Sequence, residues 1–376
     1  MSDLDTLDVA TTPHASAAVF VATFAAILLT IVGLLFVDLT LARVDARASE
    51  HRAADLFREG QSLLDSGRAG DATDRFASAV AMQRNNVSYA LGLAQATLAD
   101  GHGDEAEATL KSILARAETD GAVNLSMARV LLVERKVSDA KAYYHRAIYG
   151  QWGADSVQQR MRSRFEIIDL LARRRETSEM LAELLPLEAE AADSAPLRKR
   201  VATLLLQAGS PRRAIANFRE VLRADPRDAD AHAGLGEAAL ALGNFFTARA
   251  DLLEATRYRP GDAHIQRRLA LADTVLALSP SVRGIDAGAR FTRSRALLAR
   301  TVAERERCGG LTPFTMALVD SARAVVASGV RPADLSAASD ELMARTTAVW
   351  MTRPVQCRAG YAPAEALALI LARIAQ

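Results

Sequence analysis

Small residues recur at a fixed interval through the middle of the chain. Alanines lie 34 residues apart in two series, at Ala72, Ala106 and Ala140 and again at Ala214 and Ala248. This interval is typical of stacked helical hairpins, in which each hairpin buries its apolar face against the next. The pattern therefore predicts an all-α solenoid of helical hairpins over residues 53–279.

Other positions fall into register with these alanines. The clearest copy has Leu235, Gly236, Ala239, Gly243, Leu252, Ala255 and Pro260 in its columns. Gly60, Ala94, Ala128 and Ala202 share the column of Gly236, where a small residue lets two helices approach closely. Phe76, Tyr144 and Phe218 share the column of Leu252 and can fill the space between hairpins. These columns resemble the tetratricopeptide repeat, whose pattern is W-x2-L-G-x2-Y, then A-x3-F, then P.

The spacing also predicts the repeat boundaries. Units are expected near 53–86, 87–120, 121–154, 195–228 and 229–262, with a final first helix at 263–279. No copy has the tryptophan of the fourth column of the family pattern. Residues 155–194 keep helical spacing but stretch the interval, so this degenerate unit is expected to form a bend or an irregular pair of helices.

An uncharged apolar stretch precedes the repeats at residues 15–37. About 20 apolar residues are enough to span a bilayer. The short tail at residues 1–14 is acidic, whereas a signal peptide has a basic leader and a small-residue cleavage site. A buried core helix is the alternative, but the rest of the chain packs without it. We therefore expect a single transmembrane helix, followed by a juxtamembrane linker at residues 38–52.

Two observations oppose each other on the side of the membrane that carries the repeats. No Lys or Arg precedes the span, whereas Arg43, Arg47 and Arg52 follow it, and the positive-inside rule alone places the repeats in the cytoplasm. Cys308 and Cys357 lie in expected loops, and as a disulfide they would need an oxidising compartment. Two unrelated reduced thiols are the alternative. We expect a single-pass protein of the bacterial inner membrane, with the repeats on the periplasmic side.

The 34-residue register disappears after residue 280, and residues 280–376 are expected to form a helical cap. Four helices are predicted, at 286–307, 313–328, 332–350 and 363–375. An apolar stripe on the third can cover the end of the solenoid, which terminal repeats need; it consists of Ala333, Leu335, Ala338, Leu342 and Val349.

Composition and motifs point away from catalysis and from nucleic acid. The net charge is +1 and aromatic residues make up 5% of the chain, which gives neither a basic surface nor a base-stacking platform. The histidines form no metal-binding pair, and two cysteines without histidines cannot complete a four-ligand zinc site. Gly234 and Gly236 resemble a dinucleotide fingerprint, but they lie inside a predicted helix. We therefore expect no enzyme activity, cofactor or metal.

The family resemblance implies where a partner would bind. In such stacks the first helices line a concave face, and side chains of the ninth column point into it. These are Gln61, Gln95, Arg129, Thr203 and Glu237, with Lys199 in the neighbouring fifth column. The Lys/Asn clamp by which some relatives hold a chaperone's C-terminal carboxylate is missing. The resemblance therefore implies a groove for an extended peptide or a partner helix.

These expectations combine into two functional hypotheses. The first is a membrane-anchored bacterial scaffold whose groove binds proteins or peptides and which supports a cell-envelope assembly, secretion or export complex. The second is a cytoplasm-facing regulatory adaptor that recruits a soluble enzyme to the inner membrane. A hydrolase or transferase in residues 281–376 is disfavoured, because no catalytic motif is found there.

Overall fold

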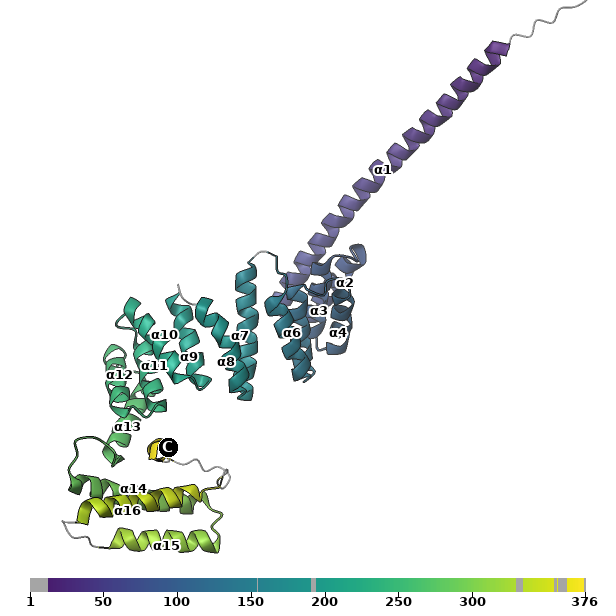
Figure 1. The fold of residues 1–376 in the computed structure, drawn as a ribbon. Coiled ribbons are helices and arrows are strands. Elements are labelled where there is room, and N and C mark those ends of the chain that lie inside the picture. The colour runs from purple at the N-terminus through teal and green to yellow at the C-terminus, as the bar shows by residue number, and fades with distance from the viewer. Residues whose placement is uncertain are drawn as a thin grey trace, which may run out of the picture. The chain divides into compact units, whose positions relative to one another are not determined.

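A computed structural model describes residues 13–153, 155–190, 194–328, 334–354, 357 and 364–374. These residues form seventeen helices and, apart from one isolated bridge between Asp120 and Gln151, no β-structure (Figure 1). The chain divides into two units, residues 1–167 and 168–376. The division falls inside the predicted degenerate repeat, whereas the sequence placed its domain boundary near residue 280. The expected all-α class is confirmed.

The first unit consists of helices that each pack against the next along the chain. They are α1 (Pro13–Asp65), α2 (Ala69–Met82), α3 (Val87–Ala99), α4 (Gly103–Leu114), α5 (Gly121–Val133) and α6 (Val137–Tyr149), followed by α7 (Ser156–Arg174), which continues into the second unit. The alanines that define the repeat are the contact points of this stack. Ala72, Ala106 and Ala140 are all 0% exposed, because a larger side chain there would hold neighbouring helices apart.

The second unit continues the same arrangement and adds the C-terminal helices. It contains α8 (Thr177–Glu190), α9 (Ala195–Gln207), α10 (Pro211–Ala224), α11 (Ala229–Ala241), α12 (Phe245–Tyr258), α13 (Ala263–Leu278), α14 (Ala287–Cys308), α15 (Pro313–Ala327), α16 (Leu335–Met351) and α17 (Glu365–Ile374). Helices α9 to α13 stack in chain order, and α14, α15 and α16 pack together as a bundle, from which Leu297, Met343 and Trp350 also contact the cluster at the end of the solenoid.

The turn inside each hairpin has one backbone geometry. After the first helix, a residue with positive φ reverses the chain. The N–H of this residue and the N–H of the residue that follows it donate to carbonyls in the last turn of that helix. At Gly101 (φ 90°), for example, the following N–H of His102 donates to the Thr97 carbonyl at 3.0 Å. Glycine takes this position in most hairpins, but Arg135 (φ 62°) and Arg175 (φ 59°) occupy it in two.

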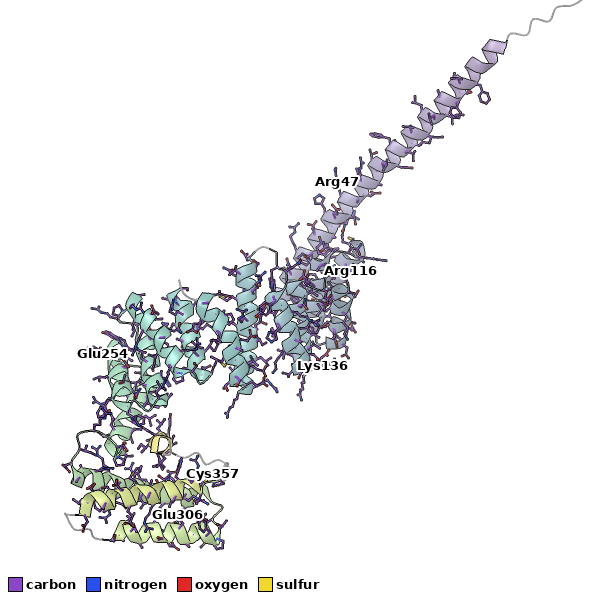
Figure 2. The ribbon with its side chains drawn as sticks, viewed as in Figure 1. Arg47, Arg116, Lys136, Glu254, Glu306 and Cys357 are labelled. Atoms are coloured by element: carbon purple, nitrogen blue, oxygen red, sulfur yellow. A yellow bond between two sulfur atoms is a disulfide. The ribbon has the colours of Figure 1, made fainter. Side chains whose placement is uncertain are left out.

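Helix α1 joins the apolar stretch to the first repeat without a break. Residues 38–52, expected as a linker, are helical throughout, because they contain neither Gly nor Pro and are rich in Ala, Leu and Arg. Arg47 projects from this exposed part of the helix (Figure 2). Among the described residues, α1 is the one helix long and apolar enough to cross a membrane, and that part of it is exposed throughout. The acidic tail at 1–12 lies outside the described residues.

The end of the solenoid is covered differently from the prediction. Leu342 and Val349 of α16 are buried against α14 and α15, together with Leu298, Val302 and Val319. Helix α17 instead packs on the last repeats: Ala366, Leu367, Ile370 and Leu371 join a cluster with Leu240, Phe245, Leu252 and Val275. Pro332, Ala333 and Pro363, which the predicted cap helices included, lie outside the described residues.

Candidate functional site

In the first unit, two of the predicted groove residues lie in one cavity. Gln61 of α1 and Gln95 of α3 line a space of about 420 Å³, together with Phe57, Leu64, Asp65, Phe76, Ser88, Leu91 and Gly92. The rings of Phe57 and Phe76 meet edge to face, with centroids 5.4 Å apart. The cavity therefore combines an aromatic floor with two amide side chains, each of which can donate and accept hydrogen bonds.

Arg129 of the same unit is engaged elsewhere. Its Nε and Nη2 donate to the Glu166 carboxylate of α7 at 3.0 and 2.6 Å, in the bidentate geometry that suits arginine and carboxylate. The hydrogen bond to Glu166 raises the pKa of Arg129. Gln95 is also partly engaged, since its Nε2 donates to Ser126 Oγ at 3.2 Å. Arg129 does not line the cavity that Gln61 and Gln95 share.

In the second unit, the other three predicted residues lie together. Lys199 and Thr203 of α9 and Glu237 of α11 line a second cavity of about 420 Å³. Its apolar lining includes Pro196, Leu206, Phe218 and Ile265. As in the first unit, the side chains come from first helices of consecutive repeats, while the aromatic ring comes from the second helix between them.

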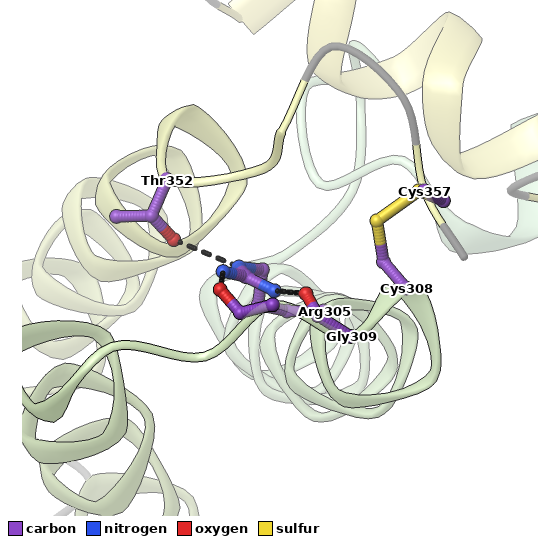
Figure 3. The surroundings of a disulfide bond; sticks show 6 residues. Arg305, Cys308, Gly309, Thr352 and Cys357 are labelled. Carbon is purple, nitrogen blue, oxygen red and sulfur yellow. Dashed lines mark hydrogen bonds between the residues drawn. A yellow bond between two sulfur atoms is a disulfide. The ribbon is translucent and has the colours of Figure 1, made fainter.

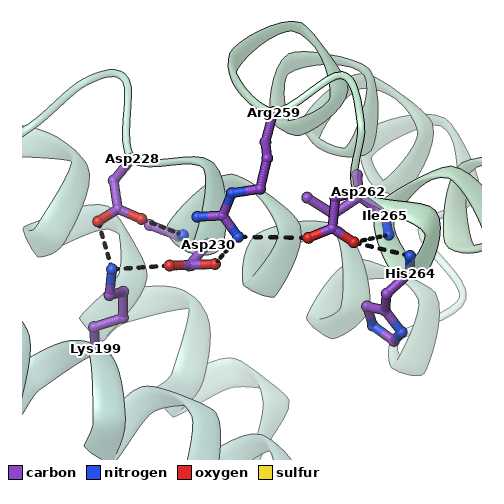
Figure 4. A network of polar contacts seen from close by, with 8 residues as sticks. Lys199, Asp228, Asp230, Arg259, Asp262, His264 and Ile265 are labelled. Atoms are coloured by element: carbon purple, nitrogen blue, oxygen red, sulfur yellow. Dashed lines mark hydrogen bonds and ion pairs between the residues drawn. The ribbon is translucent and has the colours of Figure 1, made fainter.

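A chain of ion pairs lies along this second cavity (Figure 4). Lys199 Nζ lies 2.8 Å from Asp228 Oδ2 and 3.1 Å from Asp230 Oδ2. Arg259 Nη1 continues the chain, 2.6 Å from Asp230 Oδ1 and 3.5 Å from Asp262 Oδ2. The hydrogen bond from Arg259 is the main cause of the lowered pKa of Asp230. Lys199 is thereby neutralised by two carboxylates.

The acids of this network are positioned by helix starts. Asp228 is the N-cap of α11 and accepts the N–H of Ala231 at 2.9 Å, and Asp262 caps α13 through the N–H groups of His264 and Ile265. Sequence reasoning missed these residues, although Asp228 and Asp262 are themselves 34 residues apart. Side-chain capping before first helices is the signal that could have found them.

Glu237 is paired as well. Arg268 of α13 donates Nη2 to Glu237 Oε2 at 2.6 Å and contacts the other oxygen through Nε. Its Nη1 donates to Glu365 Oε1 of α17 at 2.6 Å. Lys199, Glu237 and Arg259 are therefore already paired with opposite charges inside the protein. The surface of this cavity that is free to contact a ligand is mainly its apolar lining. In the described part of the chain, no cluster of His, Cys, Asp or Glu is arranged to hold a metal.

The two cysteines meet at the end of α14. Cys308, which is 2% exposed, is bonded to Cys357, and the two Cα atoms are 4.6 Å apart (Figure 3). Arg305 holds the adjacent backbone by donating to the Gly309 and Gly310 carbonyls at 2.6 and 3.1 Å and to Thr352 Oγ1 at 3.2 Å. This bridge joins α14 to the segment that follows α16.

Comparison with known proteins identifies the repeats. The family model of the tetratricopeptide repeat matches residues 63–130 and 205–272. No curated protein matches the chain.

Similar solved structures include three repeat proteins. The C-terminal part of a TPR repeat-containing protein from Cytophaga hutchinsonii has 15% identity and a TM-score of 0.45, over 65% of this chain and 94% of that one. YrrB, a TPR protein with an unusual peptide-binding site, has 17% identity and a TM-score of 0.40, over 51% and 96%. PilF of Pseudomonas aeruginosa has 14% identity and a TM-score of 0.40, over 59% and 99%. At these scores the likenesses give no information on function.

Proposed function

Since this chain is a tetratricopeptide repeat protein, and such repeats are in general non-catalytic scaffolds for protein or peptide binding, we propose that it is a membrane-anchored adaptor of the bacterial cell envelope. It binds peptide segments or helices of partner proteins on the face formed by its first helices. The observation that carries this proposal is the placement of the predicted side chains. Gln61 and Gln95 line one cavity, and Lys199, Thr203 and Glu237 line another.

The two cavities suit different parts of a partner. The amides of Gln61 and Gln95 can pair with the backbone of an extended segment, while the rings of Phe57 and Phe76 hold an apolar side chain. In the second unit the lining charges are already paired, so the apolar side chains there contribute most of the binding. Extended and helical segments are both recognised in these ways by grooves of other proteins.

The test removes the two amides without disturbing the fold. Gln61→Ala with Gln95→Ala in the full-length protein should abolish co-purification of the partners that the wild type retains, while the fold persists with at most about 1 kcal/mol of stability lost, because Gln95 gives up its hydrogen bond to Ser126. Gln158→Ala, at an exposed position of α7 outside both cavities, is the matched control. Arg129 and Glu237 are poor choices, because removing Arg129 would take the bidentate partner from Glu166, and removing Glu237 would take one of the two carboxylates from Arg268. Retention of every partner by the double variant would contradict the groove assignment.

Membrane attachment through residues 15–37 is supported by the exposure of α1. Phe20 and Leu29, for example, are each 76% exposed, and a bilayer would cover such side chains. The full-length protein should stay in the membrane pellet after an alkaline carbonate wash, and a chain lacking residues 1–37 should be released. Release of the full-length chain would contradict the anchor.

For the side of the membrane, we favour the periplasm, because the Cys308–Cys357 bridge is stable in an oxidising compartment. The second candidate, a cytoplasmic adaptor that recruits a soluble enzyme, is favoured by Arg43, Arg47 and Arg52 after the span. Alkaline phosphatase fused to the C-terminus should be active if the repeats are periplasmic. Fluorescence of the matching fluorescent-protein fusion, without phosphatase activity, would support the cytoplasmic adaptor instead.

A further inference from the structure

A third cavity, of about 350 Å³, lies in the second unit at the start of α12. Its lining comes from three places: the first turn of α12 with the two residues before it, the last turn of α13 with the segment that follows it, and Arg373 on α17. The residues that matter here are Phe245, Phe246, Ser279, Ser281, Arg283 and Arg373. None of the predicted groove residues takes part.

The charge of this cavity is positive. Arg283 and Arg373 both line it, and no acidic residue is among the described residues of its lining. Arg283 is exposed and makes no ion pair with any residue that the structure describes. Arg373 donates to the Gly243 carbonyl and lies 5.8 Å from the ring centroid of Phe245, again without a carboxylate among its described partners. This contrasts with the second groove cavity, where Lys199 and Arg259 each lie beside carboxylates.

The backbone adds donors to the same space. The side chain of the N-cap residue Asn244 makes no capping hydrogen bond, so the first N–H groups of α12 lack a side-chain acceptor. Second helices of several other repeats begin in the same way, so this feature alone would not identify a site. Next to two arginines, however, these N–H groups and the positive end of the helix dipole would reinforce the attraction for an anion.

An unpaired hydroxyl on a buried residue is the independent observation. Ser279 is only 5% exposed and lines the cavity. Its hydroxyl makes no hydrogen bond within the described part of the chain, and it is not among the described polar atoms that are both enclosed and unpaired, so it keeps some accessible surface. An oxyanion in the cavity would give this hydroxyl an acceptor.

We propose that this cavity binds a phosphate group, held by Arg283 and Arg373 and by the first N–H groups of α12. Arginine suits phosphate because its planar fork offers parallel donors to two oxygens. Phe246 is 60% exposed at the rim and gives a surface for an apolar remainder of the ligand. The phosphate could belong to free inorganic phosphate or to a small phosphorylated molecule, and two probes distinguish these sources.

Isothermal titration calorimetry on the full-length protein in an uncharged detergent tests the proposal. Inorganic phosphate and phenyl phosphate are titrated in chloride buffer. Tighter binding of phenyl phosphate would identify a phosphorylated molecule, and equal affinities would identify free phosphate. Arg283→Ala should weaken binding by about tenfold or more, because a charged hydrogen bond is lost, and Arg283→Lys should restore part of it.

The matched control is Arg300→Ala, at an exposed position of α14 outside the cavity. Arg283→Ala and Arg300→Ala should have the melting temperature of the wild type, because both side chains are exposed. Absence of heat with both probes would overturn the proposal. So would an Arg300→Ala variant that weakens binding as much as Arg283→Ala does.

Discussion

Two glycines of the first helices lie directly beneath aromatic rings of the preceding repeat. A Cβ atom built on Gly234 would lie 2.2 Å from Cζ of Phe218, and one on Gly92 would lie 2.8 Å from Cε1 of Phe76. Phe218 is 1% exposed, so its ring has no open space to move into. In the next repeat, Leu110 takes the place of Phe76, and Ser126 takes the place of Gly92. A residue larger than glycine therefore occurs where the aromatic ring is absent. We therefore expect Gly234→Ala to destabilise the second unit.

Two opposing effects set the magnitude. Carbon atoms pack at roughly 3.5–4.0 Å, so the new methyl group forces a displacement of more than about 1 Å. Overpacking of a core costs about 1–3 kcal/mol, and this contact belongs at the upper end. Alanine regains about 1 kcal/mol over glycine inside a helix. The net loss is about 2 kcal/mol, or roughly 4–8 °C in melting temperature for a unit of this size.

Thermal melts of the full-length protein by circular dichroism at 222 nm measure this effect. Gly261→Ala is the control, because a Cβ there would meet nothing within 4 Å. Adding Phe218→Leu to Gly234→Ala should recover part of the loss, and the double-mutant cycle should give a favourable coupling of about 1 kcal/mol or more. A melting temperature that is unchanged or raised in Gly234→Ala would refute the described packing of the ring on this helix.

Three further predictions concern stability. Arg135→Gly should raise the free energy of unfolding by about 1 kcal/mol, because Arg135 has a positive φ that glycine adopts without strain. Gly101→Ala should lower the free energy of unfolding for the same reason, and urea midpoints equal to that of the wild type for both variants would contradict this. Cys308→Ser should lower stability by about 4 kcal/mol through loss of the Cys308–Cys357 loop closure; melts that are the same with and without reductant would count against it. Hydrogen bonds, first from Lys111, lower the pKa of Glu107 from 4.5 to about 2, so its stabilising effect is present above pH 4.5 and lost towards pH 2. Glu107→Gln should therefore melt below the wild type at pH 7, and a difference that does not shrink between pH 4.5 and about 2 would refute the assignment.

The architecture was predictable because the repeat constrains many columns at once. A 34-residue interval fixes which alanines lie between helices, and Ala214 and Ala248 are fully buried as this requires. The aromatic column also follows from the pattern, since Phe76 and Phe218 lie between hairpins.

The pairing of charged residues was not predictable from the same pattern. Arg129 was expected to face a ligand, but its partner Glu166 lies in the degenerate unit, where the register no longer says which residues are neighbours. Arg268 pairs with Glu365, 97 residues away, and no local pattern encodes such a contact. For the same reason the sequence assigned the cover of the solenoid to the stripe on α16 rather than to α17.

Site-specific photo-crosslinking in intact cells tests the central claim most directly. A photoreactive amino acid is placed at Gln61, Gln95, Thr203 or, as the control, Gln158 of the full-length protein, and crosslinked partners are identified by mass spectrometry. The scaffold account predicts that the same partner crosslinks from the cavity positions and not from Gln158. Crosslinks from Gln158 alone, or equally from all four positions, would contradict binding on the face of the first helices.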